Sequence, residues 1–241
     1  MKCVGIVPCR YGASRFPGKS LADIDGKPMM WHVYQQAKKC AIFTDIYIAT
    51  DDERIEAKAV ELGLNVLMTR SNHPTGSDRV AECVEQVDAD IYVNIQGDEP
   101  MIEPEAINAV AVALANCEDR SIIVSNAYTK MHRPCDVVDT NNVKVVLTIS
   151  SMAMAYSRTA IPYPKSGEVQ YLRQLGLYAF KKSALEIFAN SSPGPIEDAE
   201  NVEMLRFLER GHPVLMVEVE DDSIPVDTPS DLERVRKAFH K

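Results

Sequence analysis

The fold is decided near the start of the chain by the run CVGIVPCRYGASRFPGKS, residues 3–20. Its first five residues are apolar and predict a buried strand, and a loop rich in glycine and positive charge follows. Gly12 and Gly18 let backbone amides come close to an anion. Fixed positive charge comes from three cations of the same loop: Arg10, Arg15 and Lys19. A strand that leads into such a loop is typical of a polyphosphate site in a sheet-based domain.

This loop is similar to a P-loop but departs from it at two points. One residue more than the P-loop pattern allows stands between Gly12 and Gly18, and one of the intervening residues, Pro17, lacks an amide donor. A P-loop also runs directly into a helix, whereas the following segment DIDGKP, residues 23–28, is typical of a turn. The sequence therefore argues against a P-loop ATPase and predicts a different phosphate-binding loop.

Length and composition set the class of protein. A chain of 241 residues with 46% hydrophobic residues predicts a single domain over residues 1–241 with a full core and a subsidiary lobe. The formal charge of −9 makes nucleic acid and anionic membranes unfavourable partners. The six cysteines form no Cys-x-x-Cys pair, which argues against a disulfide framework and favours a reducing, cytoplasmic compartment. We find no signal peptide and no apolar run long enough for a membrane helix.

Strand-like apolar runs alternate with segments of helical spacing in the first half of the chain. Strands are predicted at residues 3–7, 46–50, 65–68 and 91–95, with helices beginning near Pro28, Asp52 and Gly76. The second half is less regular, with strands predicted at 122–126, 143–149 and 214–219, a proline-containing arm at 156–167 and a final helix from Thr228. This pattern predicts an α/β fold with a mostly parallel sheet flanked by helices, and a lobe at residues 126–180.

Two aspartates are candidate metal ligands. Asp98 directly follows the predicted strand 91–95, and ligands of open parallel sheets bind at the carboxyl ends of strands. From position alone a simple turn explains Asp98 equally well, but the cationic loop favours a metal that holds phosphates. Asp227 precedes the final helix, and helix entry alone is enough to explain it. The two carboxylates can share a metal only if the fold brings them together.

The run HPTGSDR, residues 73–79, opens another predicted helix. Small polar residues at a helix start present free amides to a nucleotide, and Arg79 can pair with a phosphate or a base edge. An ordinary helix cap explains Ser77 or Asp78 but not the whole run. The five histidines have no metal-ligand spacing, and we interpret all of them as solvated or core residues: His32, His73, His132, His212 and His240.

Taken together, these motifs resemble the CMP-Kdo synthetases, that is, the 3-deoxy-manno-octulosonate cytidylyltransferases. The resemblance covers nearly the whole chain in order, and this collinearity is more specific than any single motif. It is carried by residues 7–12, 14–19, 26–29 (GKPM), 49–52 (ATDD), 76–79 (GSDR), 96–100 (QGDEP), 156–158 (YSR), 161–164 (IPYP), 176–178 (GLY) and 226–229 (VDTP).

The resemblance implies a Rossmann-like, GT-A-like nucleotidyltransferase with a small dimerisation lobe. It implies transfer of CMP from CTP to the anomeric hydroxyl of a 2-keto-3-deoxy acid sugar, with Kdo as the first candidate, and release of pyrophosphate. Mg²⁺ would be the cofactor, and the enzyme would be a cytoplasmic homodimer. Its product would serve lipopolysaccharide or capsule biosynthesis.

The same resemblance implies roles for particular residues. Those matching the nucleotide site are Pro8, Arg10, Ser14, Arg15, Lys19, Thr75, Gly76, Arg79 and Gln96. Those matching the acceptor site are Arg158, Gln174, Tyr178 and Glu203. The catalytic set would be Lys19, Arg15, Asp98 and Asp227, with the two aspartates as metal ligands. Physically, the two cations and the metal would neutralise charge that develops on the entering and leaving oxygens.

The chain also departs from the family pattern. Gln174 stands where a histidine is usual and Met204 where a glutamine is usual, while Cys9 and Pro225 replace an alanine and a glycine. We expect Gln174 and Met204 to alter which acceptor hydroxyls are bound. A divergent cytidylyltransferase for another acidic sugar or small acid therefore stays open.

Two further functions are weaker. A catalytically silent CTP-binding regulator is disfavoured by the presence of Lys19, Asp98 and Asp227 together. A GT-A glycosyltransferase is disfavoured because residues 97–99 (GDE) lack the usual Asp-x-Asp arrangement.

Overall fold

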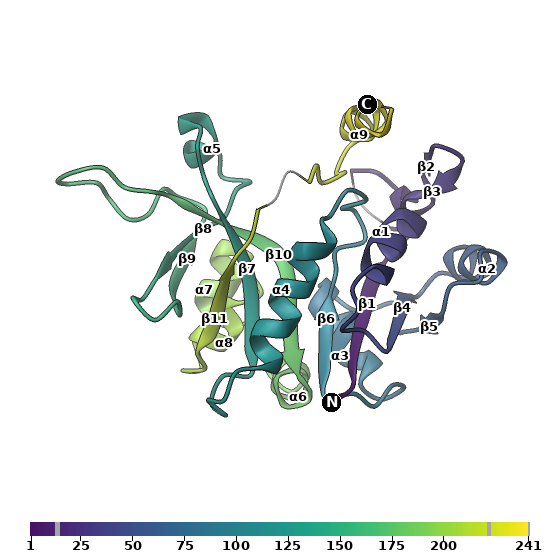
Figure 1. The fold of residues 1–241 in the computed structure, drawn as a ribbon, viewed down its shortest axis with the longest axis horizontal. Helices are drawn as coiled ribbons and strands as arrows, with labels where there is room; N and C mark the ends of the chain where they lie inside the picture. Colours follow the sequence, from purple (N-terminus) through teal and green to yellow (C-terminus); the bar gives the residue numbers. More distant parts are fainter. Residues whose placement is uncertain (13–14, 221–222, 241) are drawn as a thin grey trace.

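The structure is a computed structural model that describes residues 1–12, 15–220 and 223–240. Within these residues nine strands form one sheet, in the order β11-β7-β10-β6-β1-β4-β5, with β8 paired to β10 and β9 paired to β8 (Figure 1). The strands are β1 (Cys3–Cys9), β4 (Asp45–Thr50), β5 (Val66–Met68), β6 (Ile91–Asn94), β7 (Val124–Lys130), β8 (Lys144–Leu147), β9 (Ala153–Ser157), β10 (Leu172–Lys181) and β11 (Val214–Glu218). A separate hairpin is formed by β2 (Asp23–Ile24) and β3 (Lys27–Pro28).

Helices cover both faces of this sheet. They are α1 (Met29–Lys38), α2 (Glu53–Glu61), α3 (Gly76–Cys83), α4 (Pro104–Ala115), α5 (Pro134–Val138), α6 (Lys182–Ala189), α7 (Pro195–Glu200), α8 (Leu205–Leu208) and α9 (Pro229–Phe239), with a 3-10 helix η1 at Lys19–Leu21. Apolar residues of α1, α2 and α4 belong to one core cluster, and those of α3, α6 and α8 belong to a second.

The first strand explains why the core has two halves. Side chains alternate along a strand, so Cys3 and Val7 enter the first cluster while Val4 and Ile6 enter the second. All four side chains are fully buried. A strand of a parallel sheet that is covered on both faces must be apolar throughout, which is the pattern of residues 3–7.

The predicted fold class is confirmed. Strand β1 pairs in parallel with β4 and β6, β4 pairs in parallel with β5, and β7 pairs in parallel with β11. Strand β10 is antiparallel to both β6 and β7, so the sheet is mixed but mostly parallel around the site. The loop before η1 is not a P-loop, because η1 is only three residues long and leads into the β2–β3 hairpin.

The bounds of the predicted lobe, residues 126–180, stay a prediction. The predicted range 126–180 begins inside β7 and ends inside β10, both of which belong to the central sheet. Between them, β8 and β9 extend from β10 to one side, beside the long loop that precedes β10 (Figure 1). Among the described residues, no helix has both the length and the apolar character needed to cross a bilayer.

Candidate active site

A cavity of about 280 Å³ lies at the carboxyl ends of the parallel strands β1 and β6. Strand β1 supplies Pro8 and leads to Arg10, and β6 leads to Gln96 and Asp98. The lining residues are Pro8, Arg10, Lys19, Ser20, His73, Pro74, Thr75, Gly76, Arg79, Gln96, Gly97, Asp98, Asn201 and Glu203. Most residues predicted for the nucleotide site thus border one cavity.

Lys19 lies where three segments meet. Its ammonium contacts Asp98 Oδ2 at 2.5 Å, the carbonyl oxygen of Val226 at 3.1 Å and Asp227 Oδ1 at 3.4 Å. The loop reaches this place through Gly18, which adopts a left-handed φ of 71° and whose amide donates to the Tyr11 carbonyl at 2.7 Å. Glycine is favoured at Gly18 because other residues are strained in this conformation.

Asp227 is brought to Asp98 by the backbone. The amide of the buried residue Val226 donates to the Asp98 carbonyl at 2.9 Å. Thr228 then caps α9 through a reciprocal pair with Asp231, so the helix-entry interpretation of this segment is also correct. Asp227 additionally pairs with Arg15 at 3.0 Å. Two carboxylates that are distant in the sequence therefore share one ammonium group, that of Lys19.

Arg15 and Asp227 border a second cavity, of about 840 Å³, next to the first. Lys19 connects the two cavities, because it borders the smaller one and contacts Asp227 of the larger one. The predicted residue Ser14 lies outside the described residues. The site is thus a small cavity beside a larger one whose lining carries both basic and acidic side chains.

Gly97 allows the close approach that places Asp98. A Cβ atom at residue 97 would lie 2.7 Å from the Pro8 carbonyl oxygen and 3.0 Å from Cys9 Sγ. The backbone after β6 therefore packs directly on the end of β1, and this contact fixes the direction of the following carboxylate.

The Gly97→Ala variant should be less stable than the parent by about 1–3 kcal/mol, because the added methyl group overpacks this contact. Urea denaturation measures the loss. Gly12→Ala is the matched control for stability, since nothing lies within 4 Å of its Cβ position. Equal stability of the two variants would contradict the close contact at Gly97.

The start of α3 forms another part of the cavity wall. Thr75 is the N-cap, and its hydroxyl and the Asp78 carboxylate form a reciprocal capping box. Arg79 also borders the cavity, but its guanidinium already contacts Asp51 Oδ1 at 3.0 Å and Thr69 Oγ1 at 2.5 Å. The Thr75 amide is already bonded to Asp78 at 3.1 Å, so Gly76 is the residue of this helix start that can offer its amide to a ligand. Arg79 fixes the helix to the sheet.

His73 opens the candidate run 73–79 but was interpreted from the sequence as a solvated or core residue without a role in the site. It borders the cavity, and its Nε2 pairs with the Glu82 carboxylate. Burial alone would raise the pKa of Glu82, but the bonds from His73 and Arg70 hold that pKa below its ordinary value. The sequence feature that could have identified His73 is its place at the start of the run 73–79, which lies at the same edge of the sheet as the other site residues. Other cavity residues missed were Ser20, Pro74, Gly97 and Asn201.

Of the four residues predicted for the acceptor, only Glu203 borders the cavity. Its carboxylate accepts a hydrogen bond from Ser77 Oγ. The Tyr178 hydroxyl accepts from Gln174 Nε2 at 2.9 Å, and neither residue lines the cavity. The Arg158 guanidinium donates to backbone carbonyls of Thr140, Glu200 and Asn201. Since Asn201 borders the cavity, Arg158 supports the wall from behind.

Met204 does not face the cavity, contrary to the expectation from the sequence. Its side chain is fully buried in the second core cluster, which also contains Tyr178 and Phe207. The exchange of a polar residue for Met204 therefore changes the core beside the site and removes no group from the cavity wall. Gln174 remains as the departure that is close to the candidate acceptor residues.

The Glu203→Gln variant should make stability less dependent on pH. Burial raises the pKa of the Glu203 carboxyl, and the bond from Ser77 only partly opposes this. The folded state thus holds the proton more tightly than the unfolded chain, whose carboxyl keeps the ordinary pKa of 4.5. Stability from this group is present below that pKa and is lost as pH rises through the raised, folded pKa. The variant lacks this loss.

Thermal denaturation of both proteins between about pH 4 and 8 tests this sign. The melting temperature of the variant should rise relative to that of the parent as pH increases above 4.5, the ordinary carboxyl pKa. Parallel curves over the whole range would show that the Glu203 pKa is not raised by folding.

Comparisons with known proteins agree with this geometry. The model of the cytidylyltransferase family matches residues 4–219. The chain is 41% identical over 240 residues to a 3-deoxy-manno-octulosonate cytidylyltransferase from Solibacter usitatus, covering 99% of this chain and 94% of that protein. It is 38% identical over 236 residues to the protein of the same name from Escherichia coli, covering 98% and 95%.

Solved structures show the same relationship. A CMP:2-keto-3-deoxy-manno-octonic acid synthetase in complex with CTP superposes with a TM-score of 0.94 at 37% identity, covering 100% of this chain and 99% of that chain. A cytidylyltransferase from Leptospira borgpetersenii has a TM-score of 0.69 at 16% identity, covering 100% of this chain and 87% of that chain, and shares the fold alone. The chain therefore belongs to the cytidylyltransferase family of CTP-dependent nucleotidyltransferases.

Proposed function

We propose that the protein transfers CMP from CTP to the anomeric hydroxyl of Kdo and releases pyrophosphate. The observation that carries this proposal is the meeting of Lys19, Asp98 and Asp227 at the edge of a cavity lined by the start of α3. The relatives with 38–41% identity, which bear the name 3-deoxy-manno-octulosonate cytidylyltransferase over nearly their whole length, support the same substrate.

The residues at this point fit a divalent metal. Asp98 and Asp227 already converge on one cation, the Lys19 ammonium. Among the described residues, no group of three or more His, Cys, Asp or Glu side chains could hold a metal without further ligands. Two carboxylates completed by substrate phosphates suit Mg²⁺, which keeps few protein ligands. When bound, Mg²⁺ would supply charge neutralisation on the phosphate oxygens.

The chain's own groups then have distinct tasks. Lys19 and Arg15 neutralise the charge of the triphosphate and of the leaving pyrophosphate. The start of α3 borders the cavity, and Gly76 there offers its backbone amide to the nucleotide. Glu203 borders the same cavity and orients the acceptor, and its contact with Ser77 at the start of α3 fixes its position. These groups act by positioning and electrostatics, so the reaction needs no covalent intermediate.

The test is product analysis by mass spectrometry after incubation with CTP, Mg²⁺ and a panel of acidic sugars. The proposal predicts CMP-Kdo as the main product. Conversion of a different acid, but not of Kdo, would instead support the divergent cytidylyltransferase, which Gln174 beside Tyr178 favours. Binding of CTP without any product would support a regulator.

We also infer a homodimer in the cytoplasm. Several large apolar side chains in or next to the predicted lobe are exposed, as expected for a surface that a second copy covers: Val138, Ile149, Met154 and Tyr163. All six cysteines are free thiols, which suits a reducing compartment. Sedimentation velocity should give twice the 26.8 kDa chain mass. A monomer at micromolar concentration would contradict the dimer.

A further inference from the structure

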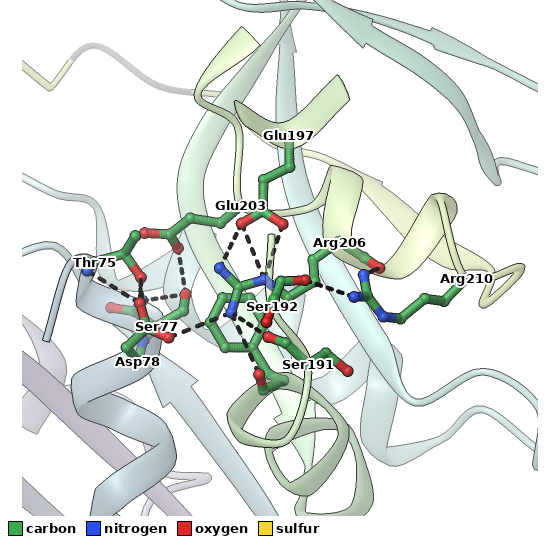
Figure 2. Close-up of polar contacts among 11 residues, drawn as sticks. Thr75, Ser77, Asp78, Ser191, Ser192, Glu197, Glu203, Arg206 and Arg210 are labelled. Atoms are coloured by element: carbon green, nitrogen blue, oxygen red, sulfur yellow. Dashed lines mark hydrogen bonds and ion pairs between the residues drawn. The ribbon is translucent and has the colours of Figure 1, made fainter. Parts of the chain in front are cut away.

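Arg206 is the centre of a buried polar network beside the active site (Figure 2). It lies in α8 and is only 2% exposed. Its guanidinium makes a two-point contact with Glu197, with Nε–Oε2 at 2.9 Å and Nη2–Oε1 at 2.6 Å. Its Nη1 reaches Asp78 Oδ1 at 3.3 Å. The guanidinium carbon also lies 3.7 Å from the centre of the Phe188 ring.

The Asp78 side of the network leads to the cavity. While Oδ1 of Asp78 contacts Arg206, its Oδ2 accepts from the backbone amide of Thr75 at 3.1 Å and from its hydroxyl at 2.7 Å. Thr75 borders the cavity. Figure 2 shows these bonds in sequence from Arg206 through Asp78 to Thr75. A single carboxylate thus joins the buried arginine to the helix start that borders the cavity.

The acceptor side is reached from the same segment. Glu203 borders the cavity and lies three residues before Arg206 in the sequence. Its carboxylate accepts from Ser77, the residue next to Asp78 (Figure 2). Segment 203–206 therefore contacts two adjacent residues at the start of α3. Glu203 bonds to Ser77, and Arg206 bonds to Asp78.

We propose that Arg206 is a positioning residue that fixes the nucleotide wall at Thr75 relative to the acceptor wall at Glu203. This inference rests on the proposed function. Arginine suits the task because its planar, five-donor group serves Glu197, Asp78 and two backbone carbonyls at once. A lysine offers a single ammonium on a flexible stem and cannot hold all these partners.

A merely structural role would treat the two acidic partners of Arg206 alike. Glu197 and Asp78 are both largely buried and both pair with the same guanidinium. Neutralising either one should cost stability, because the remaining buried charge is less well paired. Only Asp78, however, is bonded to a cavity residue. The two carboxylates therefore form a matched pair that separates stability from positioning.

The experiment compares Asp78→Asn with Glu197→Gln. Thermal denaturation measures stability, and calorimetric titration with CTP measures nucleotide binding without turnover. We expect both variants to melt at lower temperature than the parent, whereas only Asp78→Asn weakens CTP binding, by about five- to tenfold. Glu197→Gln should bind CTP within about twofold of the parent. Equal effects of the two variants on CTP binding, or none from Asp78→Asn, would overturn the proposal.

A double variant shows whether Asp78 acts together with Arg206. We expect Arg206→Lys to weaken CTP binding to a similar degree, and Asp78→Asn/Arg206→Lys to be no weaker than the worse single variant, because both changes break one link. Multiplication of the two single effects would show independent action and would contradict the proposal. Parental CTP binding and turnover, measured first, test the proposed function separately.

Discussion

Replacing Lys19 with methionine should lower kcat for CMP transfer by about 10²–10³-fold, the usual loss when one preorganised charge is removed from a transition state. The ammonium is the group that Asp98, Asp227 and the Val226 carbonyl hold in place. The fold should survive, because the carboxylates left behind are 24% and 42% exposed and can be hydrated. Continuous measurement of pyrophosphate release, with melting temperature alongside, gives both results.

The chain offers a matched control for this change in Lys182. Its ammonium also pairs with an aspartate, Asp88, at 2.7 Å, but on an exposed surface. Lys182 directly follows β10, whose Lys181 pairs with Ile91 at the amino end of β6, away from the cavity. Lys182→Met should keep the parental kcat. If the Lys19→Met variant lost no more activity than this control, Lys19 would have no part in transfer.

Asp98→Asn should have a still larger effect, a loss of about 10³-fold or more in kcat. The amide is the same size as the carboxylate, but a formal negative charge next to Lys19 is lost. The variant should therefore lose metal-dependent charge neutralisation, which stabilises the transition state by several kcal/mol. Each 1.4 kcal/mol corresponds to about a tenfold change in rate. CTP binding measured without metal should change little, because Lys19 is released from its contact at 2.5 Å and can pair with phosphate instead.

Titration of activity with Mg²⁺ distinguishes this explanation from a general loss of structure. The Asp98→Asn variant should need a higher Mg²⁺ concentration for half-maximal rate and should keep the parental melting temperature within a few degrees. Asp88→Asn, which neutralises an exposed partner of Lys182, is the control. An unchanged Mg²⁺ requirement in the Asp98→Asn variant would remove Asp98 from the metal site.

The sequence predicted the first half of the fold better than the second for a physical reason. Strands β1 and β6 are buried on both faces and are therefore continuously apolar, which is easy to recognise. Strand β10 was missed because only its second half is buried. Its first half carries Arg173 and Gln174, and the pairing with β7 shifts register between Gln174 and Tyr178. The sequence of β10 therefore lacks the regular alternation of apolar and polar residues that identifies a strand.

The site shows the same division. The loop with Lys19 and the position of Asp98 after β6 could be read from local patterns. The distance between Asp98 and Asp227 could not, because it depends on the hydrogen bond from Val226 to the Asp98 carbonyl, made by segments distant in sequence. Met204 was misplaced because neighbouring residues in a helical turn point in different directions, so Glu203 faces the cavity while Met204 enters the core.

The most direct test of the account is the rate of pyrophosphate release from CTP in the presence of Mg²⁺ and Kdo. We predict release that requires both CTP and Kdo, is strongly reduced by Lys19→Met and Asp98→Asn, and is unchanged by Lys182→Met. Absence of release with Kdo, in a protein that still binds CTP and is folded, would contradict the assignment of this site to CMP transfer onto Kdo.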